Sequence, residues 1–157
     1  MKDFVLSCQL FENLDPTYVS SVASLAVKHS LAGGERLFEF GTEATHLYAV
    51  IDGTMELCLP LSIQGTIKEV VVESQGPGAT IGWSAFVKPY RFRLAARAQG
   101  PVTLAAFDRL ALLNLIDLDP AFGRAILGCI AETISKRLLT VQALWARELQ
   151  RSVVDRQ

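Results

Sequence analysis

The residues with the clearest chemical potential lie between positions 78 and 98, in the stretch GATIGWSAFVKPYRFRLAARA. The stretch opens on a glycine turn, has Gly82 four residues later, and ends in a basic run that includes Arg91 and Arg93. Glycine lets a backbone approach a ligand closely, and the guanidinium of arginine pairs with carboxylate or phosphate oxygens. The pattern predicts a loop that closes over an anion, although Trp83 stands where such a loop would need a polar group. A solvated strand face explains the same basic run, so both interpretations stay open.

No other group of side chains has the spacing of a catalytic or metal site. His29 and His46 are remote in sequence and have no carboxylate motif around them. Ser84 has no GxSxG turn and no neighbouring histidine, which a serine nucleophile needs. The three cysteines are scattered and form no CxxC pair, which disfavours a zinc or iron–sulfur site: Cys8, Cys58 and Cys129. We therefore expect a non-enzymatic protein with reduced, buried thiols.

The bulk composition predicts one ordinary globular domain. The chain has 157 residues, of which 50% are apolar and 20% charged, so it can build a packed core. The formal net charge of −1 gives no long-range attraction to nucleic acid or to anionic lipid. The N-terminus carries acidic residues inside its short apolar stretch, unlike a signal peptide, and no segment has eighteen uninterrupted apolar residues. We expect a cytoplasmic protein that binds neither membrane nor nucleic acid.

The first part of the chain is predicted to be helical. Asp15 can cap a helix that has Pro16 in its first turn, and an apolar face follows at helical spacing. The helical region is expected to run to about residue 30, with a break at residues 32–34.

The middle of the chain, to about residue 107, is predicted to consist of short strands. Asp52-Gly53 is a hairpin signal, and Pro60 is expected to end a strand. Many short strands with closely spaced turns indicate an antiparallel barrel or jelly roll. The expected strands cover residues 36–40, 47–51, 54–59, 67–73, 95–98 and 102–107.

The last part, about 108–153, is predicted to be helical again. Asp108 can cap a short helix over 109–116, and Asp119-Pro120 can begin a long one of roughly 45 Å. Its apolar stripe exceeds what a small barrel can cover, which favours a parallel two-helix dimer seam. Packing of the stripe onto the barrel is the alternative. The expected seam residues are Ile134, Leu138, Val141 and Trp145.

The landmarks occur in the order typical of cyclic-nucleotide-binding domains. They are Gly34-Glu35, Phe40-Gly41, Leu47-Tyr48-Ala49-Val50 with Gly53, Gly78 with Gly82, and Asp108-Arg109 separated by five residues from Leu115. Over about residues 10 to 150 the chain resembles the sensor half of the bacterial Crp–Fnr regulators. The resemblance implies a mainly β fold, an antiparallel β-barrel or double-stranded β-helix jelly roll (about 31–107) with N-terminal helices and a long C-terminal helix. It implies one such domain over 1–157, and no DNA-binding domain is expected after the long helix.

The resemblance also implies a phosphate-binding cassette, Gly-Glu-Leu/Ile-Ala and then Arg-Ser/Thr-Ala. In the family, backbone N–H groups of a short helix and the arginine hold the cyclic phosphate, while the glutamate accepts a hydrogen bond from the ribose 2′-hydroxyl. Here the glutamate falls on Trp83 and the arginine on Phe92, with Arg91 and Arg93 on either side. Alternation along a strand would direct both arginines away from Phe92, although a one-residue shift could bring one inward. The expected ligand-binding residues are Ile81, Gly82, Trp83, Ser84, Ala85, Arg91, Phe92, Arg93 and Leu94.

Two functions remain open at this point. The first is a sensor of weakened or altered specificity, for cAMP, cGMP or another anionic small molecule, that acts through a homodimer or a protein effector. The second is a dimerising interaction scaffold whose pocket is filled by Trp83 and Phe92. The volume of the cavity distinguishes these two functions. Open space beside Arg91 or Arg93 favours a sensor, and a packed aromatic interior favours a scaffold.

Overall fold

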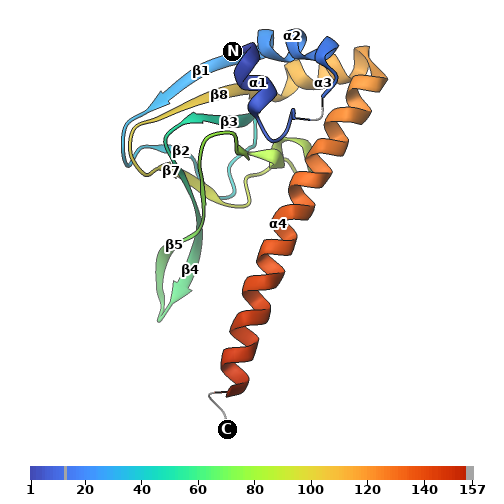
Figure 1. Cartoon of the computed structure of the whole chain (residues 1–157). Coiled ribbons are helices and arrows are strands. Elements are labelled where there is room, and N and C mark those ends of the chain that lie inside the picture. The colour runs from blue at the N-terminus through green and yellow to red at the C-terminus, as the bar shows by residue number, and fades with distance from the viewer. Residues whose placement is uncertain (13, 155–157) are drawn as a thin grey trace.

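A computed structural model describes residues 1–12 and 14–154. Asn13 and residues 155–157, which the expected domain over 1–157 includes, lie outside the described residues. Helices stand at both ends of the chain and strands lie between them (Figure 1). The elements are α1 Lys2–Ser7, α2 Pro16–Leu25, β1 Ala26–Leu31, β2 Arg36–Phe38, β3 His46–Asp52, β4 Met55–Ile63, β5 Thr66–Gln75, β6 Thr80–Ile81, the 3₁₀ turn η1 Trp83–Phe86, β7 Ala95–Ala98, β8 Val102–Asp108, α3 Arg109–Leu118 and α4 Pro120–Val154.

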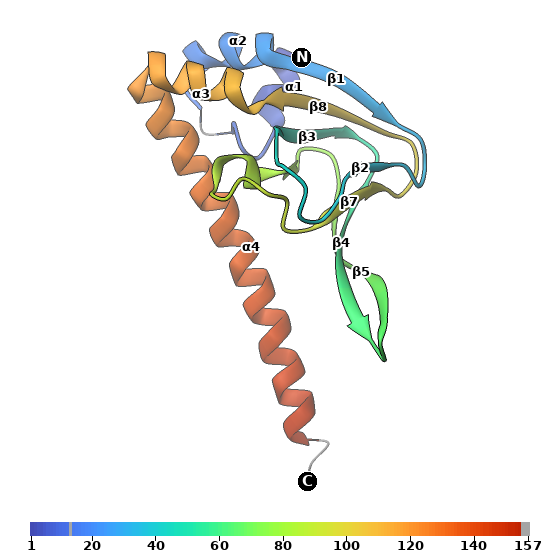
Figure 2. The same cartoon turned by 180° about the vertical axis from the view of Figure 1, so that it is seen from behind.

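The strands form two four-stranded antiparallel sheets, in the orders β1-β8-β3-β6 and β2-β7-β4-β5 (Figure 2). One buried cluster joins the two sheets and includes Val50 of β3, Leu57 of β4, Ala96 of β7 and Leu104 of β8. A second, larger cluster lies between the first sheet and the helices, with Phe11, Phe107 and Phe122 among its members. This arrangement confirms the predicted jelly roll, although the two sheets do not close into a single barrel.

The helical prediction for the N-terminal region is wrong after Leu25. Residues Ala26–Leu31 form strand β1, which pairs with β8 from Ala26↔Phe107 to Leu31↔Val102. The strand region therefore begins five residues earlier than expected, because pairing with a distant strand outweighs the local helical pattern. The predicted start of the preceding helix is confirmed, since the Asp15 carboxylate accepts a hydrogen bond from the Thr17 N–H at 2.9 Å.

Two turn signals in the middle region were misread. Asp52-Gly53 does not close a hairpin, because β3 and β4 belong to different sheets. Gly53 is nevertheless required there: its φ is +84°, and a Cβ would lie 2.4 Å from the Pro101 carbonyl oxygen. Pro60 does not end β4, which continues to Ile63. In the described residues β4 pairs with β5 alone beyond Cys58, so a proline without an N–H is tolerated at this half-paired position.

Strands β4 and β5 form a long hairpin that projects from the second sheet (Figure 1). Arg36 holds its base, because the two guanidinium nitrogens donate to the two carboxylate oxygens of Glu69 at 2.7 and 2.8 Å. These hydrogen bonds are the main reason that the pKa of Glu69 lies below its ordinary value. A carboxyl with a lowered folded-state pKa stabilises the fold above its unfolded-state pKa, and this stabilisation is lost as pH falls through the folded-state pKa.

Glu69→Gln is therefore expected to lower the free energy of unfolding at neutral pH by about 0.5–1 kcal/mol, the range of solvent-accessible ion pairs. The difference from the wild type should shrink as pH falls through the lowered folded-state pKa of Glu69, because the wild-type carboxyl then becomes protonated. Urea unfolding at neutral pH and at a pH below that pKa measures both quantities. Asp52→Asn, at an exposed position, is the matched control. An equal decrease in the free energy of unfolding at both pH values would mean that the carboxylate charge of Glu69 does not contribute to stability.

The predicted caps of the C-terminal helices are confirmed. Asp108 accepts a hydrogen bond from the Ala111 N–H at 2.8 Å at the start of α3, and Asp119 accepts from the Ala121 and Phe122 N–H groups at the start of α4. Helix α4 has 35 residues and extends well beyond the sheets (Figure 1). Among the described residues, no helix combines the length and the apolar character needed to cross a lipid bilayer.

Candidate functional site

The cassette begins where β6 ends. Gly82 has φ +82°, and a Cβ there would lie 2.9 Å from the His46 carbonyl oxygen, so only glycine fits this turn without strain. The turn directs the chain into η1, where Ser84 and Ala85 are buried and Trp83 is half-buried against the helix-facing core. Ile81, which precedes the turn, belongs to the core between the sheets. Of these residues, Gly82, Trp83 and Ser84 line the cavity at the predicted site.

The aromatic ring of Phe92 occupies the position at which the family arginine was expected. It is 4% exposed and stacks on Phe38, with ring centroids 3.7 Å apart and planes inclined by 7°. Tyr48 also stacks on Phe38, with ring centroids 6.0 Å apart. The Phe92 backbone is held as well, because its N–H donates to Thr42 O at 2.9 Å and its carbonyl accepts from Gly41 N–H at 2.8 Å. Phe92 is therefore an integral part of the packed interior.

The three arginines of the basic run have separate environments. Arg91 and Arg93 are exposed and flank buried Phe92 in the sequence, but this segment precedes β7 and is not a strand, so the alternation expected for a strand does not decide where the two arginines point. The Arg91 guanidinium donates to the Gly41 carbonyl at 2.8 Å, and the Arg97 guanidinium pairs with Glu56 at 2.7 Å. Arg93 is left as the arginine of this run that lines a cavity.

That cavity is small. Its volume is about 60 Å³, and Gly82, Trp83, Ser84, Phe92, Arg93 and Leu94 of the predicted site line it, together with Phe38, Leu57 and Arg137. Ligand pockets for small molecules usually measure roughly 300 Å³ or more. The predicted residues are thus brought together, apart from Arg91, Ile81 and Ala85, which do not line the cavity. The space that they enclose is too small for a cyclic nucleotide.

The sequence analysis missed Arg137, which reaches the cavity from α4. Its guanidinium pairs with the Glu73 carboxylate of β5 at 2.9 Å, so the ion pair ties the long helix to the hairpin. Burial lowers the pKa of Arg137, and the Glu73 charge opposes this effect. A signal did exist: Arg137 follows Ile130 and Ile134 at helical spacing, and therefore lies on the side of α4 that faces the sheets.

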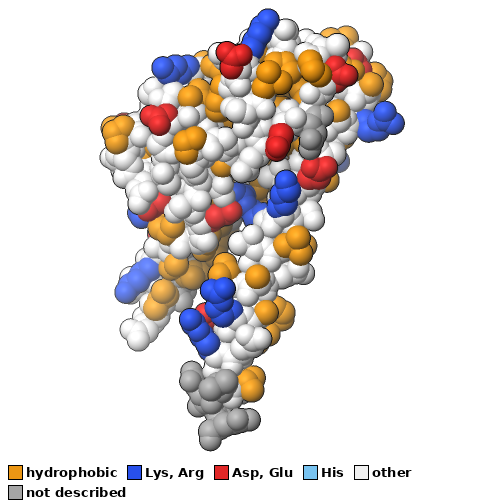
Figure 3. Space-filling view, in the orientation of Figure 1, with side chains coloured by type: hydrophobic (Ala, Val, Ile, Leu, Met, Phe, Trp, Pro, Cys, Tyr) orange, Lys and Arg blue, Asp and Glu red, His pale blue; other side chains and the backbone are white. Residues whose placement is uncertain are grey.

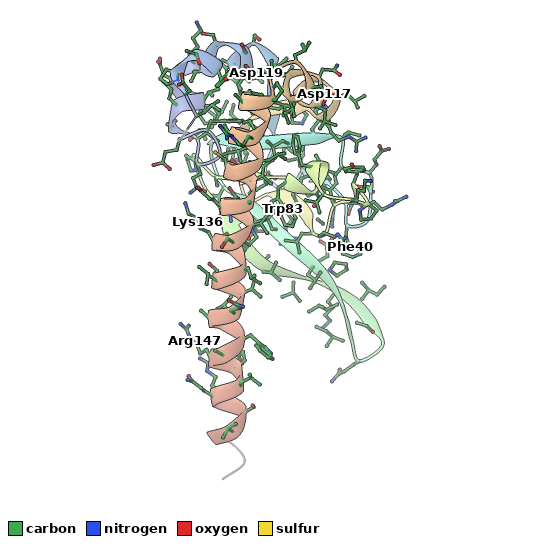
Figure 4. The ribbon with its side chains drawn as sticks, turned by 90° about the vertical axis from the view of Figure 1, so that its right-hand side faces the viewer. Phe40, Trp83, Asp117, Asp119, Lys136 and Arg147 are labelled. Atoms are coloured by element: carbon green, nitrogen blue, oxygen red, sulfur yellow. The ribbon has the colours of Figure 1, made fainter. Side chains whose placement is uncertain are left out.

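The expected seam on α4 is largely exposed. Ile134 packs partly against the helix-facing core, but Leu138 and Val141 are each 55% exposed and Trp145 is 66% exposed. Figure 3 shows hydrophobic side chains along the part of α4 that extends beyond the sheets. In Figure 4, Trp83 lies close to the helix, while Lys136 and Arg147 project from its other side. The far half of α4 thus presents an apolar surface that nothing in the described chain covers.

Comparison with known proteins gives one family. The family described as "Cyclic nucleotide-binding domain" matches residues 28–119. No curated protein sequence matches the chain. Its fold is similar to that of several solved structures.

A protein from Geobacter metallireducens GS-15, assigned as cyclic nucleotide-binding, has 24% identity and a TM-score of 0.74, over 87% of this chain and 97% of that one. The N-terminal domain of a transcriptional regulator from Streptomyces coelicolor A3(2) has 25% identity and a TM-score of 0.69, over 85% and 94%. The catabolite activator protein of Thermus thermophilus has 23% identity and a TM-score of 0.70, and the match covers 87% of this chain and 62% of that one. The fold is that of the Crp–Fnr-type sensor domains, and the chain belongs to the cyclic nucleotide-binding domain family.

Proposed function

We propose that the chain is a non-enzymatic regulatory domain that acts by self-association along α4, and that its nucleotide site is closed by its own aromatic residues. The stack of Phe92 on Phe38 beside a cavity of about 60 Å³ supports the closed site, and the exposed apolar side chains of Leu138, Val141 and Trp145 support self-association along α4. The family glutamate and arginine are replaced by Trp83 and Phe92, so neither ribose nor cyclic phosphate has its usual partner. The proposed unit is the single domain over 1–157, and its expected cytoplasmic location is part of the proposal.

Loss of both polar anchors predicts a large loss of nucleotide affinity. A hydrogen bond to a charged group is worth roughly 1.5–3 kcal/mol, so two lost anchors correspond to a loss of at least about two orders of magnitude in affinity. Displacing the buried ring of Phe92 would add a further unfavourable contribution. We therefore expect no cyclic nucleotide binding in the range typical of a signalling domain.

Isothermal titration of the purified protein with cAMP and cGMP tests this expectation. No saturable heat at millimolar nucleotide supports the closed site. Saturable binding at micromolar nucleotide would contradict it, and loss of that binding in Arg93→Ala would show that Arg93 replaces the family arginine. Arg91→Ala is the matched control, since Arg91 is equally exposed in the same loop but does not line the cavity.

A second candidate function, sensing of a small anion other than a cyclic nucleotide, rests on one observation. Two arginines, Arg93 and Arg137, are among the residues that line the small cavity beside aromatic rings. A compact carboxylate could pair with one of them and contact the ring of Phe92. Arg137 already pairs with Glu73, so such a ligand would have to compete with that ion pair. Self-association along α4 does not require the Arg137–Glu73 ion pair to be broken, and we therefore prefer it to anion sensing.

A further inference from the structure

A second cavity lies outside the sheets, on the other side of Arg137. It has a volume of about 350 Å³ and is bounded by α4, by the end of β5, by β6 and by the segment that follows α1. Its size falls within the range of small-molecule pockets, roughly 300–1,000 Å³. Arg137 lines both cavities, but no residue of the cassette lines this second one, so the two sites can be tested with different variants.

The face of α4 that lines this cleft changes from apolar to polar residues where the cleft begins. Nearer the start of α4, Phe122 and Ile126 on this face are buried in the core. Further along the same face, at steps of three and four, the cleft is lined by Thr133, Lys136 and Thr140. A helix face that served only to pack against the body of the protein would stay apolar. Lys136 and Thr140 are exposed, so this polar part of the face is open to solvent and accessible to a polar ligand.

Two of the charged side chains in the cleft form an ion pair with each other. Three others form no ion pair within the described residues and are called the free set. Arg137 and Glu73 neutralise each other at 2.9 Å. Glu12, Glu132 and Lys136 also line the cleft, and within the described residues none of these three forms an ion pair. The free set thus offers carboxylates for a cation and one ammonium for an anion, which complements a molecule that carries both charges.

One polar group at the back of the cleft has unused hydrogen-bonding capacity. Thr80 is only 3% exposed, and its hydroxyl is paired with the Cys8 sulfur at 3.3 Å. A thiol is a weak hydrogen-bond partner, so the Thr80 oxygen can take part in a stronger hydrogen bond with a ligand atom. The side-chain amides of Gln9 and Gln75 add neutral donors and acceptors around it.

We propose that this polar cleft binds a small zwitterion of the α-amino-acid class. Lys136 pairs with the carboxylate of the ligand, Glu12 and Glu132 pair with its ammonium group, and Thr80 contacts its side chain. The ligand thereby bridges α4 to the segment after α1 and to β6, and it stabilises one position of the long helix. The cleft does not compete with the apolar seam, because Lys136 and Val141 are separated by about 140° around the helix.

The test is a thermal-shift screen of the full chain against the common L-α-amino acids, followed by isothermal titration of any that raise the melting temperature. Binding to the folded state alone raises stability in a saturable way. We expect at least one amino acid to do so, and we expect its N-acetyl and carboxamide derivatives, which each lack one charge, to bind more weakly. Glu132→Gln and Lys136→Gln should each reduce the affinity by roughly ten- to a hundredfold.

The matched controls are Glu148→Gln and Arg147→Gln, which remove the same kinds of charge from exposed positions of α4 outside the cleft. They should leave the affinity unchanged. The proposal is overturned if no amino acid stabilises the protein, or if binding is the same in the cleft variants as in the controls. Cyclic nucleotide titrations do not bear on this result, so the cleft and the closed nucleotide site can fail separately.

Discussion

Phe92→Ala is expected to lower the free energy of unfolding by about 3–5 kcal/mol, the range for removal of a buried phenylalanine ring. Phe92 is 4% exposed and lies against Phe38 at 3.7 Å between ring centroids, so its removal leaves a cavity and also exposes one face of the Phe38 ring. Ala44 and Ala85 are small and buried beside it, and neither can extend to fill the space. Chemical unfolding monitored by circular dichroism measures the loss.

Phe40→Ala provides the matched control. Phe40 precedes the loop that holds Phe92, and its side chain is 49% exposed (Figure 4). Its replacement should cost about 1 kcal/mol or less. If the two variants were destabilised equally, the aromatic stack would not be a structural element, and the argument for a closed nucleotide site would lose its main support.

Val141→Asp is expected to convert the self-associated protein to a monomer. In a parallel two-helix seam the substitution places two carboxylates close to each other in an apolar contact, which should weaken association by roughly a hundredfold or more. The substitution should leave the fold of the monomer intact, since Val141 is 55% exposed within one chain. Sedimentation equilibrium of the wild type and the variant measures the association constant directly.

Ala143→Asp introduces the same charge two residues away, about 200° around the helix, also at an exposed position. The proposal expects this variant to associate as the wild type does. A wild-type protein that is monomeric at all accessible concentrations would contradict self-association, and so would equal weakening in both variants. Trp145, 66% exposed on the same stripe, gives a fluorescence signal that should shift to the red when the seam is opened.

The local features of the fold were readable from the sequence. The aspartates that begin α2, α3 and α4, and the glycine turns at Gly53 and Gly82, depend on the backbone conformation of a few consecutive residues. Such features are encoded by side chains that are neighbours in sequence. The order of these landmarks was enough to predict the family, and the family match over 28–119 confirms it.

Strand pairing was less accessible, because it depends on partners that are remote in sequence. Ala26–Leu31 is a strand because β8 supplies its hydrogen bonds, and Asp52-Gly53 joins two sheets although the dipeptide is typical of hairpins. Pro60 remains within a strand because the sheet narrows to two strands at that point. In each case the prediction rested on a local pattern, and the tertiary partner decided the outcome.

In the candidate site, too, some features follow from the local sequence and others only from tertiary packing. The sequence by itself determined that Trp83 and Phe92 stand where the family has its polar anchors, and it left open whether Arg91 or Arg93 could take the place of the family arginine. Only the tertiary structure decided that Phe38 covers Phe92, and that Arg137 of α4 reaches the cavity and pairs with Glu73. The physical reason is that side-chain type is a property of one segment, whereas the volume of a cavity and the partner of a charge depend on how distant segments pack.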